Sequence, residues 1–69
     1  MDKQTQPSAT ILRRKQVETR TGLSRSTIYD RIRAGTFPAP VSLGAKAVGW
    51  LEHEIDAWLA GRIAQRDQA

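Results

Sequence analysis

A short segment with its own start and stop signals constrains the fold of this 69-residue chain most strongly. Ser24 is a favoured helix N-cap, because its hydroxyl can accept a hydrogen bond from a first-turn backbone N–H that the helix leaves unpaired. Gly35 can adopt the left-handed conformation that ends a helix, and Pro38 prevents the helix from resuming. Gly22 lies in the three-residue connection before it, which is typical of a tight turn between two steeply crossing helices. The sequence therefore predicts a helix-turn-helix whose second helix spans Ser24–Ala34.

This second helix is predicted to have one apolar and one polar face. Ile28 and Ile32 are four residues apart and share the packing face. The other side carries polar and basic side chains, which are Ser26, Asp30 and Arg33, with Thr27 and Tyr29 on the flanks. We interpret this helix as the recognition helix of a DNA-binding module.

A weaker first helix is predicted over roughly Arg14 to Thr21, after a short extended piece at residues 11–12. Val17 is its only strongly apolar residue, so its stability must come from docking. Arg13, Arg14 and Lys15 lie at its N-terminal end, where positive charge opposes the helix macrodipole at a cost of ~0.3–1 kcal/mol per exposed charge. A bound phosphate would remove this conflict, and a solvated basic turn is the alternative interpretation.

Beyond Pro40 the apolar residues alternate with period two, which is typical of strands. A two-residue turn at Gly44-Ala45 would join the two strands into a β-hairpin. Because two strands alone are marginal, the hairpin's apolar residues are expected to lean on the helices; they are Val41, Leu43, Val48 and Trp50. Lys46 lies at or beside the tip, where a wing can reach a neighbouring groove or phosphate, unless it is merely an exposed lysine.

The last apolar residues recur with helical spacing, at Leu51, Ile55, Trp58, Leu59 and Ile63. They predict an amphipathic helix from about Glu52 to Gln65, with Trp58 in the core rather than serving as a base-stacking platform. Outside the single domain at 11–66, we expect a disordered N-terminal tail over residues 1–10 and a frayed C-terminus over 67–69.

Charge is distributed unevenly along the chain, whose formal net charge is +4. Residues 11–35 carry seven cationic side chains against Glu18 and Asp30, whereas residues 51–69 are net acidic. One face is therefore expected to meet a polyanion, although a solvated basic surface explains the charge alone about as well.

Several chemistries are not supported by the sequence. The chain has no Cys, and its single histidine, His53, cannot converge with its acidic neighbours on one ion, because adjacent helical residues point in different directions. We expect no metal, no cofactor and no catalysis. Without an apolar leader or an apolar run of membrane length, we expect a cytoplasmic protein with no membrane partner.

The combined motifs resemble one family closely. They are T-G-L-S-R-S-T-I-Y-D-R-I-R-A-G-T-F-P-A-P-V at 21–41, L-G-A-K-A-V-G-W at 43–50 and E-I-D-A-W-L at 54–59. This chain is similar to the AlpA family of phage and prophage regulators, within the MerR-like and excisionase-like winged helix-turn-helix group. The resemblance covers residues 11 to about 66. It implies a mainly α fold of three helices and a two-stranded wing.

The resemblance also implies which residues meet double-stranded DNA. The recognition helix would begin at Ser24 and present Arg25, Ser26, Thr27, Tyr29 and Arg33, with Lys46 on the wing. Asp30 departs from the family pattern, and it would either accept a hydrogen bond from cytosine N4 or pair with Arg33. We expect Arg14, Lys15 and Arg20 to hold phosphates.

By this resemblance the protein would regulate an integrative element, either by activating integrase transcription or by acting as an excisionase that bends attachment-site DNA. The alternative from another class is a protein-interaction module for an acidic partner such as an integrase or an RNA polymerase subunit. No long heptad helix is present, so we expect a monomer or a weak dimer that forms cooperatively on DNA.

Overall fold

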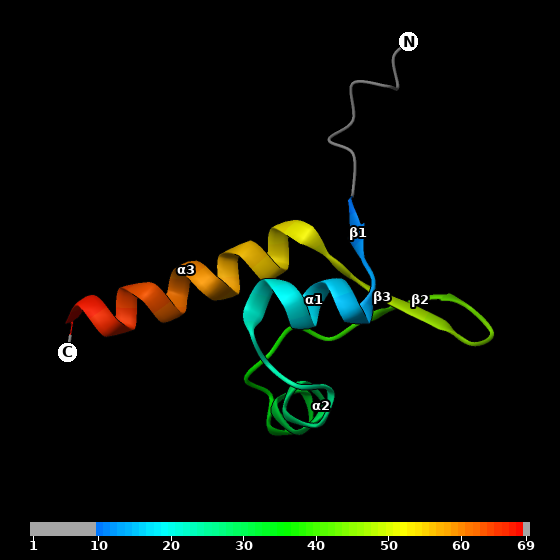
Figure 1. Ribbon diagram of the computed structural model, residues 1–69, viewed down its shortest axis with the longest axis horizontal. Coiled ribbons are helices and arrows are strands. Elements are labelled where there is room, and N and C mark those ends of the chain that lie inside the picture. Colours follow the sequence, from blue (N-terminus) through cyan, green and yellow to red (C-terminus); the bar gives the residue numbers. More distant parts are fainter. Residues whose placement is uncertain (1–9, 69) are drawn as a thin grey trace, which may run out of the picture.

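The computed structural model describes residues 10–68, which form three helices and a three-stranded antiparallel sheet (Figure 1). In chain order the elements are β1 (Ile11–Leu12), α1 (Arg14–Thr21), α2 (Arg25–Ala34), β2 (Val41–Gly44), β3 (Ala47–Leu51) and α3 (Glu52–Gln68). The predicted class, mainly helical with a small β wing, is confirmed. Of the predicted N-terminal tail, residues 1–9 lie outside the described residues. Residue 69 of the predicted frayed end also lies outside them.

The helix-turn-helix begins and ends at the residues that its capping signals predict. The Ser24 hydroxyl accepts a hydrogen bond from the Thr27 backbone N–H at 3.2 Å. Gly22 and Gly35 end α1 and α2 in the left-handed conformation, with φ of 75° and 78°. An L side chain rarely adopts this conformation, which is why glycine stands at both helix ends.

The sheet contains one more strand than the two-stranded wing that the sequence predicts. Its order is β1-β3-β2, so β3 is the central strand. Leu12 of β1 pairs with Trp50, and Val41 of β2 pairs with Gly49. The backbone N–H of Glu52 also donates to the Thr10 carbonyl at 2.9 Å, which ties the start of α3 to β1. The extended piece at residues 11–12 is therefore part of the sheet.

The predicted position of the wing turn is wrong by one residue. The turn is formed by Ala45 and Lys46, because a register shift between Ser42 and Gly44 uses one extra residue of β2 and leaves Gly44 paired with Ala47. Lys46 therefore lies in the tip itself.

Two of the four apolar wing residues do not lean on the helices as expected. Leu43 and Val48 stay 44% and 36% exposed, because the hairpin projects beyond the helices (Figure 1). Trp50 lies nearer the helices and is fully buried. The wing, which is the hairpin of β2 and β3, is therefore anchored at its base and has exposed apolar side chains toward its tip.

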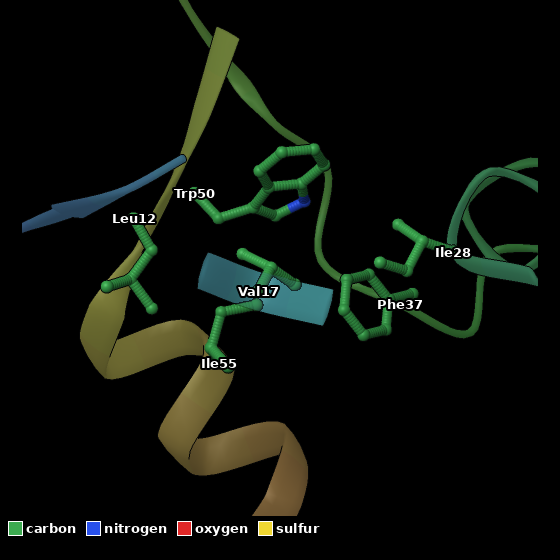
Figure 2. Close-up of a cluster of buried hydrophobic side chains, with 6 residues drawn as sticks. All are labelled: Leu12, Val17, Ile28, Phe37, Trp50 and Ile55. Carbon is green, nitrogen blue, oxygen red and sulfur yellow. The ribbon is translucent and has the colours of Figure 1, made fainter. Parts of the chain in front are cut away.

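The core draws on every element except β2. Figure 2 shows its six buried side chains converging from separate segments; they are Leu12, Val17, Ile28, Phe37, Trp50 and Ile55. Since α1 and α2 each bury only one residue completely, neither helix is expected to be stable without the others.

The closing helix is longer and less buried than the sequence predicts. It runs to Gln68, beyond the predicted end at Gln65, and Ile63 is 52% exposed because this part of α3 extends past the body (Figure 1). Trp58 is half-buried and packs its ring edge-on against Phe37, with centroids 4.8 Å apart. Along residues 10–68, no helix is both long and apolar enough to cross a membrane.

Gly49 provides a test of the sheet packing. A Cβ at this position would meet the Ile11 side chain and lie 3.2 Å from the Leu12 carbonyl oxygen, so Gly49→Ala would push β1 away from β3. We expect a loss of about 1–3 kcal/mol in the free energy of unfolding, measured by urea denaturation. Gly61→Ala is the matched control. Apart from the backbone of its own helix and its two chain neighbours, no atom lies within 4 Å of the added methyl group, and the change should stabilise α3 by up to about 1 kcal/mol. Equal effects of the two changes would contradict this packing.

Candidate nucleic-acid interface

The outward face of α2 carries a shallow hollow, here called the helix-face hollow, lined by Arg25, Ser26, Tyr29, Asp30 and Arg33. Arg33 Nη2 forms an ion pair with Asp30 Oδ1, and the guanidinium carbon of Arg25 lies 5.7 Å from the centre of the Tyr29 ring. The Arg33 and Asp30 side chains stay 72% and 67% exposed. Both arginines are therefore oriented by neighbours on their own helix while remaining accessible to a ligand.

Ser24 and Thr27, which are predicted to face DNA, lie at the start of α2 and do not line the helix-face hollow. The Ser24 hydroxyl donates to Thr27 Oγ1 at 3.0 Å and accepts from the Thr27 backbone N–H. These contacts fix the first turn of α2 and hence the orientation of the side chains that follow.

A second depression adjoins the hollow. This wing-side groove is lined by side chains from the start of α1, from α2 and from the wing, namely Arg13, Arg14, Lys15, Tyr29, Lys46 and Val48. Tyr29 lines both depressions, so they form one continuous surface. The fold thus brings predicted contacts on three separate segments to one side of the molecule.

Arg13 belongs to this surface, although it is missing from the predicted phosphate-binding set. Its Nε donates to the Val48 carbonyl at 3.2 Å, and its backbone N–H donates to the Gln16 side chain at 2.8 Å. Arg13 therefore joins the start of α1 to the wing. The signal in the sequence is its place at the head of the Arg13-Arg14-Lys15 run, directly before the helix.

Arg20, the third predicted phosphate contact, lies elsewhere. Its Nη1 lies 2.9 Å from Glu52 Oε2 and 3.2 Å from Asp56 Oδ1, both on α3. The hydrogen bond to Glu52 raises the pKa of Arg20 above its ordinary value, at which an arginine is already charged at any accessible pH. The structure thus places Arg20 in a link between α1 and α3 and outside the wing-side groove.

The surface has the chemistry of a polyanion site. Lys15 and Lys46 form no ion pair with any carboxylate of residues 10–68, whereas Arg14 is paired with Glu18 on its own helix. No group of three or more His, Cys, Asp or Glu side chains in this part of the chain is placed to hold a metal ion. Multiple cations, an exposed polar helix and a phenol ring instead suit a phosphate backbone and base edges.

Comparison with known proteins agrees with this geometry. The family model described as "Prophage CP4-57 regulatory protein (AlpA)" matches residues 10–63, which include both depressions and every strand. The chain belongs to the AlpA family. The resemblance seen in the sequence motifs is therefore confirmed.

Two similar proteins show how far the similarity extends. The chain is 47% identical over 58 residues to "DNA-binding transcriptional activator AlpA" of Escherichia coli K12, covering 75% of this chain and 83% of that protein. It is 67% identical over 45 residues to "Uncharacterized protein ORF88" of enterobacteria phage P4, covering 65% of this chain. The match spans about half the length of the phage protein, at 51%.

The N-cap of α2 can be tested separately from the exposed face. Ser24→Ala removes the acceptor for the Thr27 N–H and should lower the free energy of unfolding by about 0.5–2 kcal/mol. Ser26→Ala, two residues later on the exposed face, should change it by less than about 0.5 kcal/mol. Thermal or urea unfolding of both variants gives the comparison, and a neutral Ser24→Ala would show that the cap is dispensable.

Proposed function

We propose that this protein is a sequence-specific DNA-binding transcriptional regulator of a prophage or integrative element, acting on integrase expression and excision. The observation that carries the proposal is the continuous surface formed by the helix-face hollow and the wing-side groove. Family membership and the name of the Escherichia coli relative support it.

In the proposed complex, α2 enters the major groove, which is wide enough to admit a helix. Arg25 and Arg33 then face base edges, and a bidentate pair with guanine O6 and N7 contributes ~1–3 kcal/mol of discrimination against other bases. Asp30 holds one edge of the Arg33 guanidinium along the helix, which leaves the rest of the group to meet a base. Ser26 and Tyr29 complete the contact surface.

The wing-side groove supplies the affinity that is independent of sequence. Arg13, Arg14 and Lys15 approach phosphates at the start of α1, and Lys46 brings the wing tip to the adjacent backbone or minor groove. Each neutralised phosphate releases counterions, so binding weakens steeply as salt rises. The protein is proposed to act in the cytoplasm as a monomer or weak dimer that assembles on DNA, with an integrase or RNA polymerase as a second partner.

This proposal is tested by titrating the protein against DNA fragments from upstream of its own gene and of the neighbouring integrase gene. Random duplex of equal length is the control. Wild type should bind a native fragment with submicromolar affinity, and Arg33→Ala should weaken that binding by about 5–150-fold while changing binding to random DNA much less. Equal, weak binding of wild type to all fragments would refute a specific regulator. Bending of attachment-site DNA would instead assign the protein to the excisionase class.

Two charge variants test which cations bind phosphate and which only join two helices. Lys15→Gln removes a cation from the wing-side groove and should make the negative slope of log K against log salt shallower by roughly 0.9, equally on native and random DNA. Arg20→Gln removes a cation that is already paired with Glu52 and Asp56. It should leave the slope unchanged and should lower the unfolding midpoint. A slope change with Arg20→Gln would restore Arg20 to the phosphate-binding set.

A further inference from the structure

Trp58 holds two guanidinium groups on the side of α2 that faces away from the wing. The guanidinium carbon of Arg31, from α2, lies 6.0 Å from the centre of the Trp58 ring, and that of Arg62, from α3, lies 5.7 Å from it. We call these three side chains the tryptophan–arginine cluster. Arg31 Nε is buried without a hydrogen-bond partner in the described residues, and Arg62 is exposed.

The two arginines of this cluster differ from most other arginines of residues 10–68 in having no carboxylate partner. Four arginines of residues 10–68 form ion pairs with carboxylates, in the pairs Arg14–Glu18, Arg20–Glu52/Asp56, Arg33–Asp30 and Arg66–Asp67. The cations of this range without such a pair fall into two groups. One lies around the helix-face hollow and wing-side groove, and the other is Arg31 with Arg62.

Each of the two guanidinium groups lies against the Trp58 ring, and no carboxylate of residues 10–68 pairs with either of them. Stacking on Trp58 compensates in part and restricts both side chains, so little conformational entropy remains to be lost when an anion binds. An anion that contacts either guanidinium group would supply the negative partner that it lacks. Phosphate suits this arrangement, because guanidinium donors match its oxygens in geometry.

The cluster lies on the opposite flank of the recognition helix from the wing-side groove. Arg31 follows Tyr29 by two residues, which turns its side chain by roughly 200° around α2. Figure 1 shows the same arrangement at the level of elements, since the wing and the C-terminal half of α3 extend to opposite sides of α2. A helix in the major groove lies between two sugar–phosphate walls, and the wing-side groove accounts for one of them.

We propose that Arg31 and Arg62, held on Trp58, bind the phosphate backbone of DNA on the flank of α2 opposite the wing. This inference rests on the proposed function and adds a second phosphate-binding surface to it. The C-terminal half of α3 buries no side chain fully. In the complex its role would be to place Arg62 beside the DNA backbone on the flank of α2 opposite the wing.

The competing occupant is an acidic segment of another protein. An apolar groove adjoins the cluster and is lined by the connection after α2 and by α3, including Phe37, Pro38, Pro40, Ala57 and Trp58. Glu54 also lines this groove and would repel an acidic segment. The observations therefore favour DNA over a protein at the arginines.

Salt-dependent DNA binding of Arg62→Gln tests the inference by fluorescence anisotropy on native and random duplexes. The slope of log K against log salt, which is negative, should become shallower by roughly 0.9, and affinity should fall several-fold on both duplexes alike. Arg66→Gln is the matched control, one turn further along α3 and already paired with Asp67, and its slope should equal that of wild type. Arg31→Lys keeps the charge of the half-buried member and should retain most of the slope.

The outcomes separate this inference from the proposed function. If wild type binds DNA specifically and Arg62→Gln matches it in slope and affinity, the second surface is refuted while the proposed function stands. If Arg62→Gln binds DNA normally but loses a complex of wild type with purified integrase or RNA polymerase, the cluster is a protein-docking site and the inference is wrong. Failure of wild type to discriminate between native and random DNA would refute the proposed regulator itself.

Discussion

The positions of the other elements depend on the indole of Trp50. It is fully buried in the central strand, its ring meets Tyr29 edge-on at 6.3 Å, and its Nε1 donates to the Pro38 carbonyl at 3.0 Å. A second indole, that of Trp58, donates to the Thr36 carbonyl at 2.8 Å. Prolines in this connection lack N–H groups, so no regular ladder can hold it, and the two tryptophans fix it by its carbonyls instead. The α2 helix, the sheet and α3 are thereby held in one arrangement.

The carboxylates determine which cations remain available. Glu52 and Asp56 stand in the first turns of α3, where they suit the helix macrodipole, and from there they also reach Arg20. Asp30 engages Arg33 without burying it. Only Arg20 is neutralised between two helices, whereas Arg14, Arg33 and Arg66 pair within their own helices and the remaining cations of residues 10–68 have no carboxylate partner. Net charge alone would not reveal this division, because it depends on which side chains the fold brings together.

Local signals in the sequence predict much of the fold. Ser24 and Gly35 fix the ends of α2, because a helix cap acts within one turn of the chain. The apolar spacing around Ile55 identifies α3, because that spacing also depends only on residues close together in the sequence. The rest depends on distant partners. The β-bulge that moves the wing turn follows from pairing with β3, and the role of Arg20 follows from carboxylates on α3, more than 30 residues later. Likewise, no spacing rule in the sequence predicts that Arg62 and Arg31 lie against the same tryptophan ring.

The wing and α3 are parts of one uninterrupted stretch of chain. β3 ends at Leu51 and α3 begins at Glu52, so no flexible residue separates the strand from the helix. The distance between the wing tip and the outer part of α3 is therefore fixed by regular secondary structure. In the proposed complex, the DNA would therefore have to fit its groove to this span. Sequences whose groove dimensions already match, or deform cheaply, would bind best even at base pairs that no side chain touches.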